Sequence, residues 1–478
     1  MSRTGPPTDQ SARDDIATLL DQNLFVEAGA GTGKTTALIG RMVAMVLDRA
    51  MPIESIVAIT FTERAASELR DRFRLSLEHV VRTEADGNRR DLAERALTDV
   101  DLAAISTLHG FARRILTEHP LEAGLPPAFD LLDEVTSRLA FDERWNELER
   151  RLLDDPALSH TLLLAADLDI TPGHLRDLAE KLDENWDLLL VTGSPPPDPV
   201  VDVGPLLAAL DAITILGRDD LPDDDKLQTR IDAVASLRTE IATLTDDFDL
   251  LALLQVKRGL STVKFGSPGA TAVWGDTKAE IIAAKKVAVE MWDTTIVDVS
   301  DQVLRRLLHE LIVGARTAAE ERRHAGVLTF HDLLVDARNL LADPDVGPAV
   351  RAALNERYRA ILLDEFQDTD PIQLELALMI ADPVSRPGAP LDESSPAGGS
   401  IFMVGDPKQS IYAWRGARPG LARQVGRDYE LKRESMTKSY RSTPEVIDFV
   451  AEVFDEEKLP NNEVLEEFSV GEKVASDW

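Results

Sequence analysis

The sequence predicts an α/β protein built on a parallel sheet and interrupted by a large helical insertion. Five short apolar runs have the length and composition of buried parallel strands, over 24–26, 56–61, 103–106, 361–363 and 401–404. The first three are each followed by helical spacing of apolar residues, over 35–47, 63–81 and 111–116. Strand followed by helix, repeated along the chain, is typical of a doubly wound sheet.

The stretch between the third and fourth strands has a different character. Residues 119–325 are rich in Leu, Ala and Asp, and Leu304, Leu307, Leu311 and Ala315 keep one helical face apolar. We therefore predict a helical domain inserted into the sheet domain. Its tryptophans are most simply read as its core: Trp145, Trp186 and Trp292.

Length and composition exclude several classes of protein. At about 150 residues per domain, 478 residues suggest roughly three domains, and 44% apolar with 29% charged residues is ordinary globular composition. Cysteine is absent, which excludes disulfides, cysteine zinc sites and cysteine-ligated iron–sulfur clusters. The longest apolar runs are too short to cross a bilayer, and residues 1–10 have no apolar signal region. We expect a cytoplasmic protein with no membrane partner.

The net charge argues against a nucleic-acid partner. The chain carries 52 Lys and Arg against 85 Asp and Glu, a formal charge of −33. Proteins that bind nucleic acid usually carry a basic footprint. A local groove can nevertheless differ in sign from the whole molecule, so the charge is an objection to be weighed against the motifs.

The segment AGAGTGKT, residues 28–35, follows the first predicted strand and opens a predicted helix. A glycine-rich turn at a helix N-terminus lets backbone N–H groups cradle phosphates, with Lys34 reaching the β- and γ-phosphates and the Thr35 hydroxyl binding Mg²⁺. Ala28 stands where the strict pattern has Gly, and the alternative is a glycine-rich turn without a ligand. The predicted nucleotide-binding residues are Ala28, Gly29, Ala30, Gly31, Thr32, Gly33, Lys34, Thr35 and Thr36.

The segment ILLDEFQDTD, residues 361–370, is an apolar strand that ends in carboxylates. In an ATPase, Asp364 would hold Mg²⁺ and Glu365 would orient and deprotonate the attacking water. The alternative is an acidic strand end at the protein surface.

Together these motifs resemble the UvrD/RecB-like branch of superfamily 1 DNA helicases, in its N-terminal half. Further segments fit the order of that family: ITFTERAASELRDRF (59–73) resembles motif Ia, ISTLHGFARRIL (105–116) motif Ib, VGDPKQSIYAWRGA (404–417) motif III and SYRSTPEVI (439–447) motif IV. LTFHDLL (328–334) resembles the segment that re-enters the first motor domain. VEAGAGTGKT and TFTERAASELR are most similar to the RecB/AddA-like subgroup.

The resemblance implies roles for residues that the two motifs do not reach. Gln10 would read the adenine edge, Tyr440 would stack on adenine, Gln409 would sense the γ-phosphate, and Arg441 would contact it as an arginine finger. Ordinary surface hydrogen bonding is the alternative for each. The implied DNA-facing residues, for which core packing is the alternative at the aromatics, are Phe61, Thr62, His109, Phe330, Tyr412, Trp414 and Arg415.

The resemblance also implies an architecture and an activity. A first RecA-like, P-loop domain would span 1–118 and 326–435, the helical insertion 119–325, and the start of a second RecA-like domain 436–478. The implied activity is that of an ATP-dependent 3′–5′ helicase and translocase that uses ATP and Mg²⁺ on single-stranded DNA in repair and recombination. Single/double-strand junctions and a second helicase–nuclease subunit would be its partners.

Two alternatives from other classes remain. Motifs V and VI and a nuclease signature are not found in the sequence, which favours an ATP-binding module without independent motor activity. The charge of −33 favours a P-loop enzyme acting on a small molecule, such as a kinase.

Overall fold

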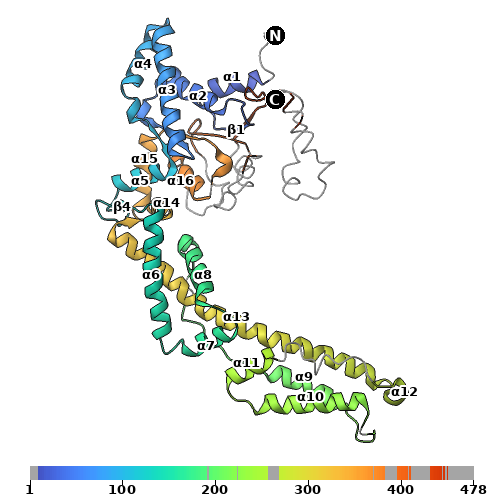
Figure 1. The fold of residues 1–478 in the computed structure, drawn as a ribbon. Helices are drawn as coiled ribbons and strands as arrows, with labels where there is room; N and C mark the ends of the chain where they lie inside the picture. The colour runs from blue at the N-terminus through green and yellow to red at the C-terminus, as the bar shows by residue number, and fades with distance from the viewer. Residues whose placement is uncertain are drawn as a thin grey trace. The chain divides into compact units, whose positions relative to one another are not determined.

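The computed structural model divides into two compact units, one formed by residues 1–131 with 325–478 and the other by residues 132–324 (Figure 1). Each unit is described separately below. The described residues are 9–190, 193–222, 224–256, 269–369, 371–382, 396–406, 409–410, 431–443, 445, 446 and 449.

The first unit contains a six-stranded sheet in the order β3-β2-β6-β7-β1-β8, in which every pairing is parallel. Its strands are β1 (Leu24–Ala28), β2 (Ile56–Thr60), β3 (Ala104–Thr107), β6 (Ala360–Leu363), β7 (Ile401–Gly405) and β8 (Lys432–Met436). The first five coincide with the five predicted strands. The predicted α/β fold with a parallel sheet is confirmed.

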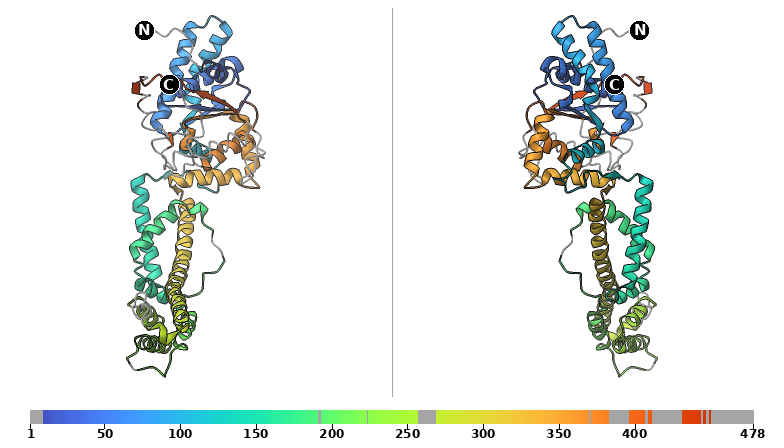
Figure 2. Two further views of the ribbon diagram at one scale, coloured as in Figure 1. Left: turned by 90° about the vertical axis from the view of Figure 1, so that its right-hand side faces the viewer. Right: turned by 90° about the vertical axis from the view of Figure 1, so that its left-hand side faces the viewer.

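Both faces of this sheet are covered, as Figure 2 shows. Successive side chains of a strand point to opposite faces, and β1 illustrates the result: Phe25 packs into one core, whereas Leu24 and Val26 pack into the other. The Phe25 side is covered by α5 (Leu108–Glu118), α14 (Phe330–Ala342), α15 (Gly347–Arg357) and α16 (Pro371–Ala381). The Leu24 side is covered by α1 (Gln10–Thr18), α2 (Lys34–Arg49), α3 (Glu63–Thr83) and α4 (Gly87–Thr98).

Several of these helices begin directly after a strand, at a side chain that caps the helix. The hydroxyl oxygens of Thr62, Thr107 and Thr329 accept hydrogen bonds from the first turns of α3, α5 and α14. Short 3₁₀ turns and a two-stranded parallel ladder complete the unit: η1 (Ile53–Ser55), η2 (Val100–Leu102), η4 (Phe366–Asp368), β4 (Asp130–Leu131) and β5 (Val327–Leu328).

The second unit is helical throughout its described residues, as predicted for the insertion. The elements are α6 (Glu134–Asp154), α7 (Ser159–Asp167), α8 (Pro172–Glu184), η3 (Trp186–Leu188), α9 (Gly204–Thr214), α10 (Lys226–Thr243), α11 (Asp247–Val256), α12 (Thr271–Trp274) and α13 (Thr277–Ala325). The long helix α13 runs the length of the unit (Figure 1). Its Trp292 is fully buried, and Trp145 and Trp186 are also buried, as the sequence predicts.

The predicted boundary at residue 118 falls before the point where the contacts divide. Ala123, Leu125 and Phe129 pack into the sheet core, and β4 pairs with β5, so residues 119–131 group with the sheet unit. The predicted second RecA-like domain, 436–478, lies almost entirely outside the described residues, and the domain bounds stay a prediction. No helix in the described part of the chain is long and apolar enough to cross a membrane.

Candidate functional site

The segment after β1 forms a tight turn into the N-terminus of α2, as predicted for a phosphate loop. Gly31 and Gly33 adopt φ of 75° and 93°, in the left-handed region that favours glycine. A Cβ at Gly31 would also overlap Ser439 and Arg441. The buried Thr32 hydroxyl donates to the Gly29 carbonyl oxygen at 2.9 Å, which holds the turn closed. The loop therefore presents the unbonded N–H groups and positive end of α2.

Lys34 and Glu365 join the two predicted motifs. The Lys34 Nζ lies 2.5 Å from Glu365 Oε2, although 331 positions separate them in the sequence. Parallel strands bring this about because their carboxyl ends share one edge of the sheet. Glu365 has φ of 51°, an uncommon conformation for a residue with a side chain, whose strain costs about 1–3 kcal/mol.

Asp364 carries an unusual charge environment. Its backbone N–H donates to the Ile59 carbonyl oxygen at 2.9 Å, which fixes it at the end of the sheet. Burial, and then repulsion by the neighbouring Glu365 carboxylate, raise the pKa of Asp364 to about 6. A bound cation would oppose both effects, so the group is suited to a metal contact.

Gln367, which sequence analysis did not single out, connects the ends of β6 and β7. Its amide nitrogen donates to Glu365 Oε2 at 2.8 Å, and its amide oxygen accepts from the Asp406 N–H at 2.8 Å. Gln409 in turn bonds to the Asp406 carboxylate. The predicted γ-phosphate sensor is thus two hydrogen-bonded residues away from Gln367, and through it from Glu365. Gln367 is 4% exposed, and only its place inside DEFQDT hinted at a role.

The segment after β8 lies directly on the phosphate loop. The Tyr440 N–H donates to the Gly31 carbonyl oxygen at 2.8 Å, and the Ser439 hydroxyl donates to that of Ala30 at 3.1 Å. The structure therefore brings Tyr440 and Arg441 beside the phosphate loop. Gln10 is exposed and its amide bonds to Asp14 of the same helix at 2.7 Å.

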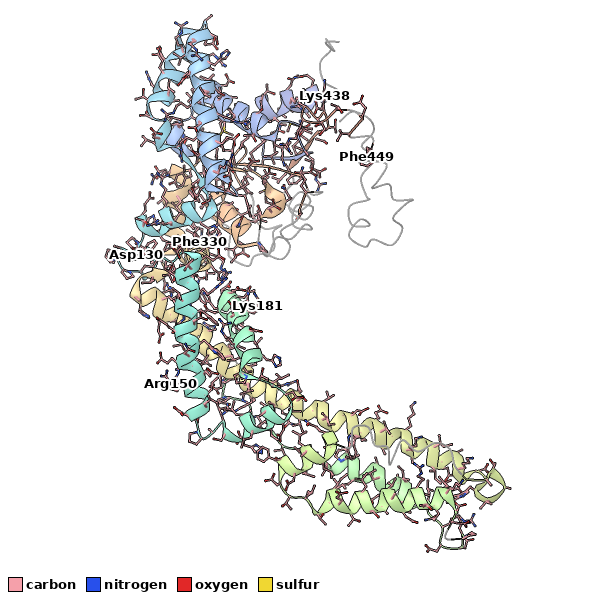
Figure 3. The ribbon with its side chains drawn as sticks, viewed as in Figure 1. Asp130, Arg150, Lys181, Phe330, Lys438 and Phe449 are labelled. Atoms are coloured by element: carbon pink, nitrogen blue, oxygen red, sulfur yellow. The ribbon has the colours of Figure 1, made fainter. Side chains whose placement is uncertain are left out.

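Four of the seven predicted DNA-facing residues are described. Phe61 and Thr62 follow β2, and His109 follows β3, the neighbouring strand. His109 meets the Phe330 ring edge-to-face at 5.4 Å. Phe330, labelled in Figure 3, is 46% exposed, which excludes a core role. Tyr412, Trp414 and Arg415 lie outside the described residues.

His109 is a neutral side chain near pH 7. Its burial, and then the nearby His331, hold its pKa below the usual range. A neutral imidazole cannot pair with a phosphate through charge, but it can stack and donate one hydrogen bond. Together, His109 and Phe330 offer ring surface rather than positive charge.

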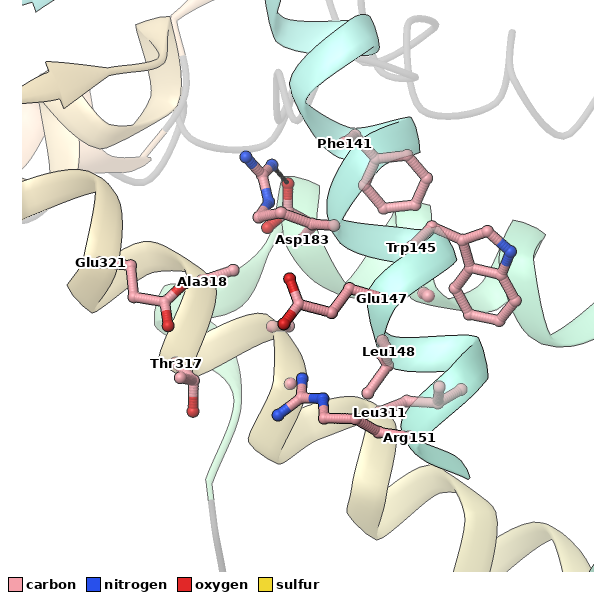
Figure 4. Close-up of a pocket in the computed structure, with 14 residues that line it drawn as sticks. Phe141, Trp145, Glu147, Leu148, Arg151, Asp183, Leu311, Thr317, Ala318 and Glu321 are labelled. Carbon is pink, nitrogen blue, oxygen red and sulfur yellow. Dashed lines mark hydrogen bonds and ion pairs between the residues drawn. The ribbon is translucent and has the colours of Figure 1, made fainter. Parts of the chain in front are cut away.

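The cavity in the helical unit contains none of the predicted site residues (Figure 4). It measures about 80 Å³ and lies between α6, α8 and α13. Its Asp183 is paired with Arg144 at 3.3 Å and with Arg322 at 2.9 Å. Ligand pockets usually exceed about 300 Å³, so this cavity is too small for a nucleotide. In the described part of the chain, no group of three or more His, Asp or Glu side chains could hold a metal ion.

Similarity to known proteins agrees with this geometry. The UvrD/REP helicase N-terminal domain family matches residues 9–430. The chain belongs to this family. The predicted resemblance to UvrD/RecB-like helicases is thereby confirmed.

Bacterial relatives narrow the subgroup. Proteins named as subunits of an ATP-dependent helicase/nuclease are 26% identical to this chain in Pediococcus pentosaceus, over 91% of the chain, and 25% identical in Listeria welshimeri, over 90%. One from Enterococcus faecalis is 25% identical over 91% of the chain. These names agree with the expected AddA-like subgroup. The chain spans 38% of the length of the first two relatives and 37% of the third.

Proposed function

We propose that this chain is the ATP-hydrolysing part of a motor that moves 3′ to 5′ on single-stranded DNA. The observation that carries the hydrolysis is the contact of Lys34 with Glu365 at 2.5 Å, at the end of a glycine-rich phosphate loop. Membership of a helicase family supports DNA as the track, and the direction rests on the resemblance to that family. The relatives' names, which describe one part of a helicase/nuclease, support a role in DNA repair and recombination beside a second subunit.

The phosphate loop would bind the triphosphate. Backbone N–H groups from Gly29 to Thr36 and the Lys34 ammonium would surround the β- and γ-phosphates. The Thr35 hydroxyl and the Asp364 carboxylate are hard oxygen donors that fit Mg²⁺, which usually takes few protein ligands because phosphates and water supply the others. Bound there, Mg²⁺ would neutralise charge on the phosphate oxygens.

Glu365 would then act as the base. ATP recruits Lys34 to its phosphates, which releases the Glu365 carboxylate from the ion pair. The carboxylate accepts a proton from water as the water oxygen bonds to the γ-phosphorus, and the bond from that phosphorus to the β–γ bridging oxygen breaks. Arg441 would stabilise charge on the γ-phosphate, Gln409 would sense it, Tyr440 would stack on the adenine, and Gln10 would read its edge.

The DNA path would depend on stacking more than on charge. Phe61, His109 and Phe330 would stack bases, with Thr62 beside them, at about 1–3 kcal/mol for each aromatic. Tyr412, Trp414 and Arg415 would extend this path. Stacking is tolerant of sequence, as a moving motor requires, and it can hold a strand on a chain with a net charge of −33. We expect affinity to fall steeply with salt, because few cations offset the protein's own negative charge.

The test is ATP hydrolysis by the purified chain with and without single-stranded DNA, beside Lys34→Ala. Lys181→Ala is a matched control, since Lys181 is 71% exposed and pairs only with nearby surface carboxylate Glu184 among the described contacts. Stimulation by DNA that is lost in Lys34→Ala and kept in Lys181→Ala is the expected result. ATP bound without turnover would support the nucleotide-binding module instead, and turnover indifferent to DNA would support a small-molecule enzyme.

A further inference from the structure

Asp9 and Arg13, at the start of α1, form an ion pair that is nearly enclosed by protein. Arg13 Nε and Nη2 donate to the two Asp9 carboxylate oxygens, both at 2.9 Å. The side chains of Asp9 and Arg13 are 2% and 18% exposed. A two-bond fork of this kind fixes orientation as well as distance. Neither residue belongs to the site predicted from the sequence.

The same pair reaches the segment that carries Tyr440. Asp9 Oδ2 also accepts hydrogen bonds from the backbone N–H groups of Thr437, at 2.9 Å, and Lys438, at 3.1 Å. Burial alone would raise the pKa of Asp9, but the bonds from Arg13, Lys438 and Thr437 outweigh it and hold the pKa below the usual range. The Arg13 guanidinium lies over the Tyr440 ring, 5.3 Å from its centroid.

Arg13 also contacts the phosphate loop. Its Nη2 donates to the Thr32 carbonyl oxygen at 2.9 Å. Three successive loop carbonyls are therefore engaged from outside the loop: Ala30 by Ser439, Gly31 by Tyr440 and Thr32 by Arg13. Since C=O and N–H of a trans peptide point in opposite directions, these bonds turn the loop's N–H groups toward the other side.

We propose that Asp9 and Arg13 are positioning residues for the nucleotide, which hold Tyr440 in register with the phosphate loop so that base and triphosphate are bound together. The inference rests on the proposed function, because it takes ATP as the ligand. Asp9 fixes the backbone that leads into Tyr440, and Arg13 supports the Tyr440 ring and links it to Thr32. Both residues act through Tyr440, and neither needs to touch the triphosphate.

The experiment measures binding of a fluorescent ATP analogue to the full chain, with inorganic tripolyphosphate as competitor. Arg13→Ala should weaken ATP about tenfold, the loss equivalent to about 1.4 kcal/mol, and leave tripolyphosphate within about twofold. Asp9→Asn should act in the same direction but less, since its amide oxygen still accepts from the backbone. Asp14→Asn is the control on the same helix, where the Asp14 side chain bonds to the exposed Gln10.

A double-mutant cycle separates positioning from a general structural role. In a Tyr440→Ala background, Arg13→Ala should cost less than about threefold, because the residue through which it acts is gone. Arg13→Lys should recover part of the affinity, since the ammonium can still bond to Asp9 and Thr32 but cannot form the fork. Asp9→Asn serves as the milder variant if Arg13→Ala unfolds, which thermal unfolding would reveal.

Equal losses of ATP and tripolyphosphate, additive effects with Tyr440→Ala, or wild-type affinity in both variants would overturn the inference. Lys34→Ala distinguishes this from failure of the proposed function. ATP binding that depends on Lys34 but is indifferent to Asp9 and Arg13 refutes only the positioning role. ATP binding that does not depend on Lys34 refutes the proposed nucleotide site itself.

Discussion

Asp364→Asn should stabilise the folded protein in the absence of nucleotide. The pKa of Asp364 is about 6, against 3.8 for the unperturbed group. The folded protein therefore binds this proton more tightly than the unfolded chain does. The stabilising contribution of the proton is complete below pH 3.8 and is lost as the pH rises through about 6. At pH 7.5 the folded protein must hold an unfavourable charge that asparagine does not carry.

The magnitude follows from the same two values. About two pH units are equivalent to about 3 kcal/mol, and because Asp364 is half-buried we expect about 1–3 kcal/mol of stabilisation at pH 7.5. At pH 5 the gain should fall to about half, since folded Asp364 is then mostly protonated. The asparagine oxygen can still accept the Glu365 N–H, which donates to Asp364 Oδ1 at 3.0 Å.

Hydrogen exchange of the β6 and β7 amides measures the stability of the sheet unit separately from the helical unit. Asp101→Asn is the control, because that carboxylate is 75% exposed, and its effect should be within about 0.5 kcal/mol at both pH values. Equal stabilisation by Asp364→Asn at pH 7.5 and pH 5 would refute the reasoning. With MgATP the ranking should reverse, because the wild type then gains ligand-binding stability that the variant loses.

Other contacts give further expectations. Arg41 is fully buried and donates to the carbonyls of Ile16, Leu19 and Gln22, so Arg41→Ala should cost about 3–5 kcal/mol of unfolding free energy in urea titrations, whereas Arg49→Ala, at an exposed pair of the same helix, should cost under about 1. An equal cost for both would contradict the role of the buried bonds. Phe330→Ala should weaken single-stranded DNA by about 1–3 kcal/mol in anisotropy titrations and spare ATP affinity, with Leu188→Ala as the exposed apolar control. Loss of both ligands would indicate a folding defect. Glu365→Gln should keep ATP binding but remove turnover; retained turnover would exclude Glu365 as the base.

Contiguous features of the site could be predicted from the sequence. The phosphate loop needs glycine at φ above zero and a lysine opening a helix, and both requirements are visible within eight letters. The five central strands are equally visible, because a strand buried on both faces is continuously apolar. β8 was missed for the complementary reason: its sequence KRESM is polar, and as an edge strand it pairs only with β1 among the described strands.

The contacts that join the walls of the site could not be predicted. Asp9 and Thr437 are 428 positions apart, and no local pattern indicates that a carboxylate before α1 receives two backbone N–H groups after β8. Gln367 presents the same difficulty, because its role depends on Asp406 at the end of a neighbouring strand. Parallel sheets bring such residues together at one edge, so the class of fold predicts that a site will form there without predicting which side chains will bond.

Three unfavourable features of the nucleotide-free site have one ligand in common. The Asp364 carboxylate is held beside Glu365 in a partly buried position, Glu365 adopts a left-handed backbone, and Lys34 is paired with Glu365 instead of a phosphate. The first would be relieved by a cation, and the third would be exchanged for contacts with the β- and γ-phosphates. Binding of MgATP would therefore release the base and neutralise its neighbour in a single event. A site arranged in this way keeps Glu365 occupied until its substrate arrives, which ties the availability of the base to the presence of ATP.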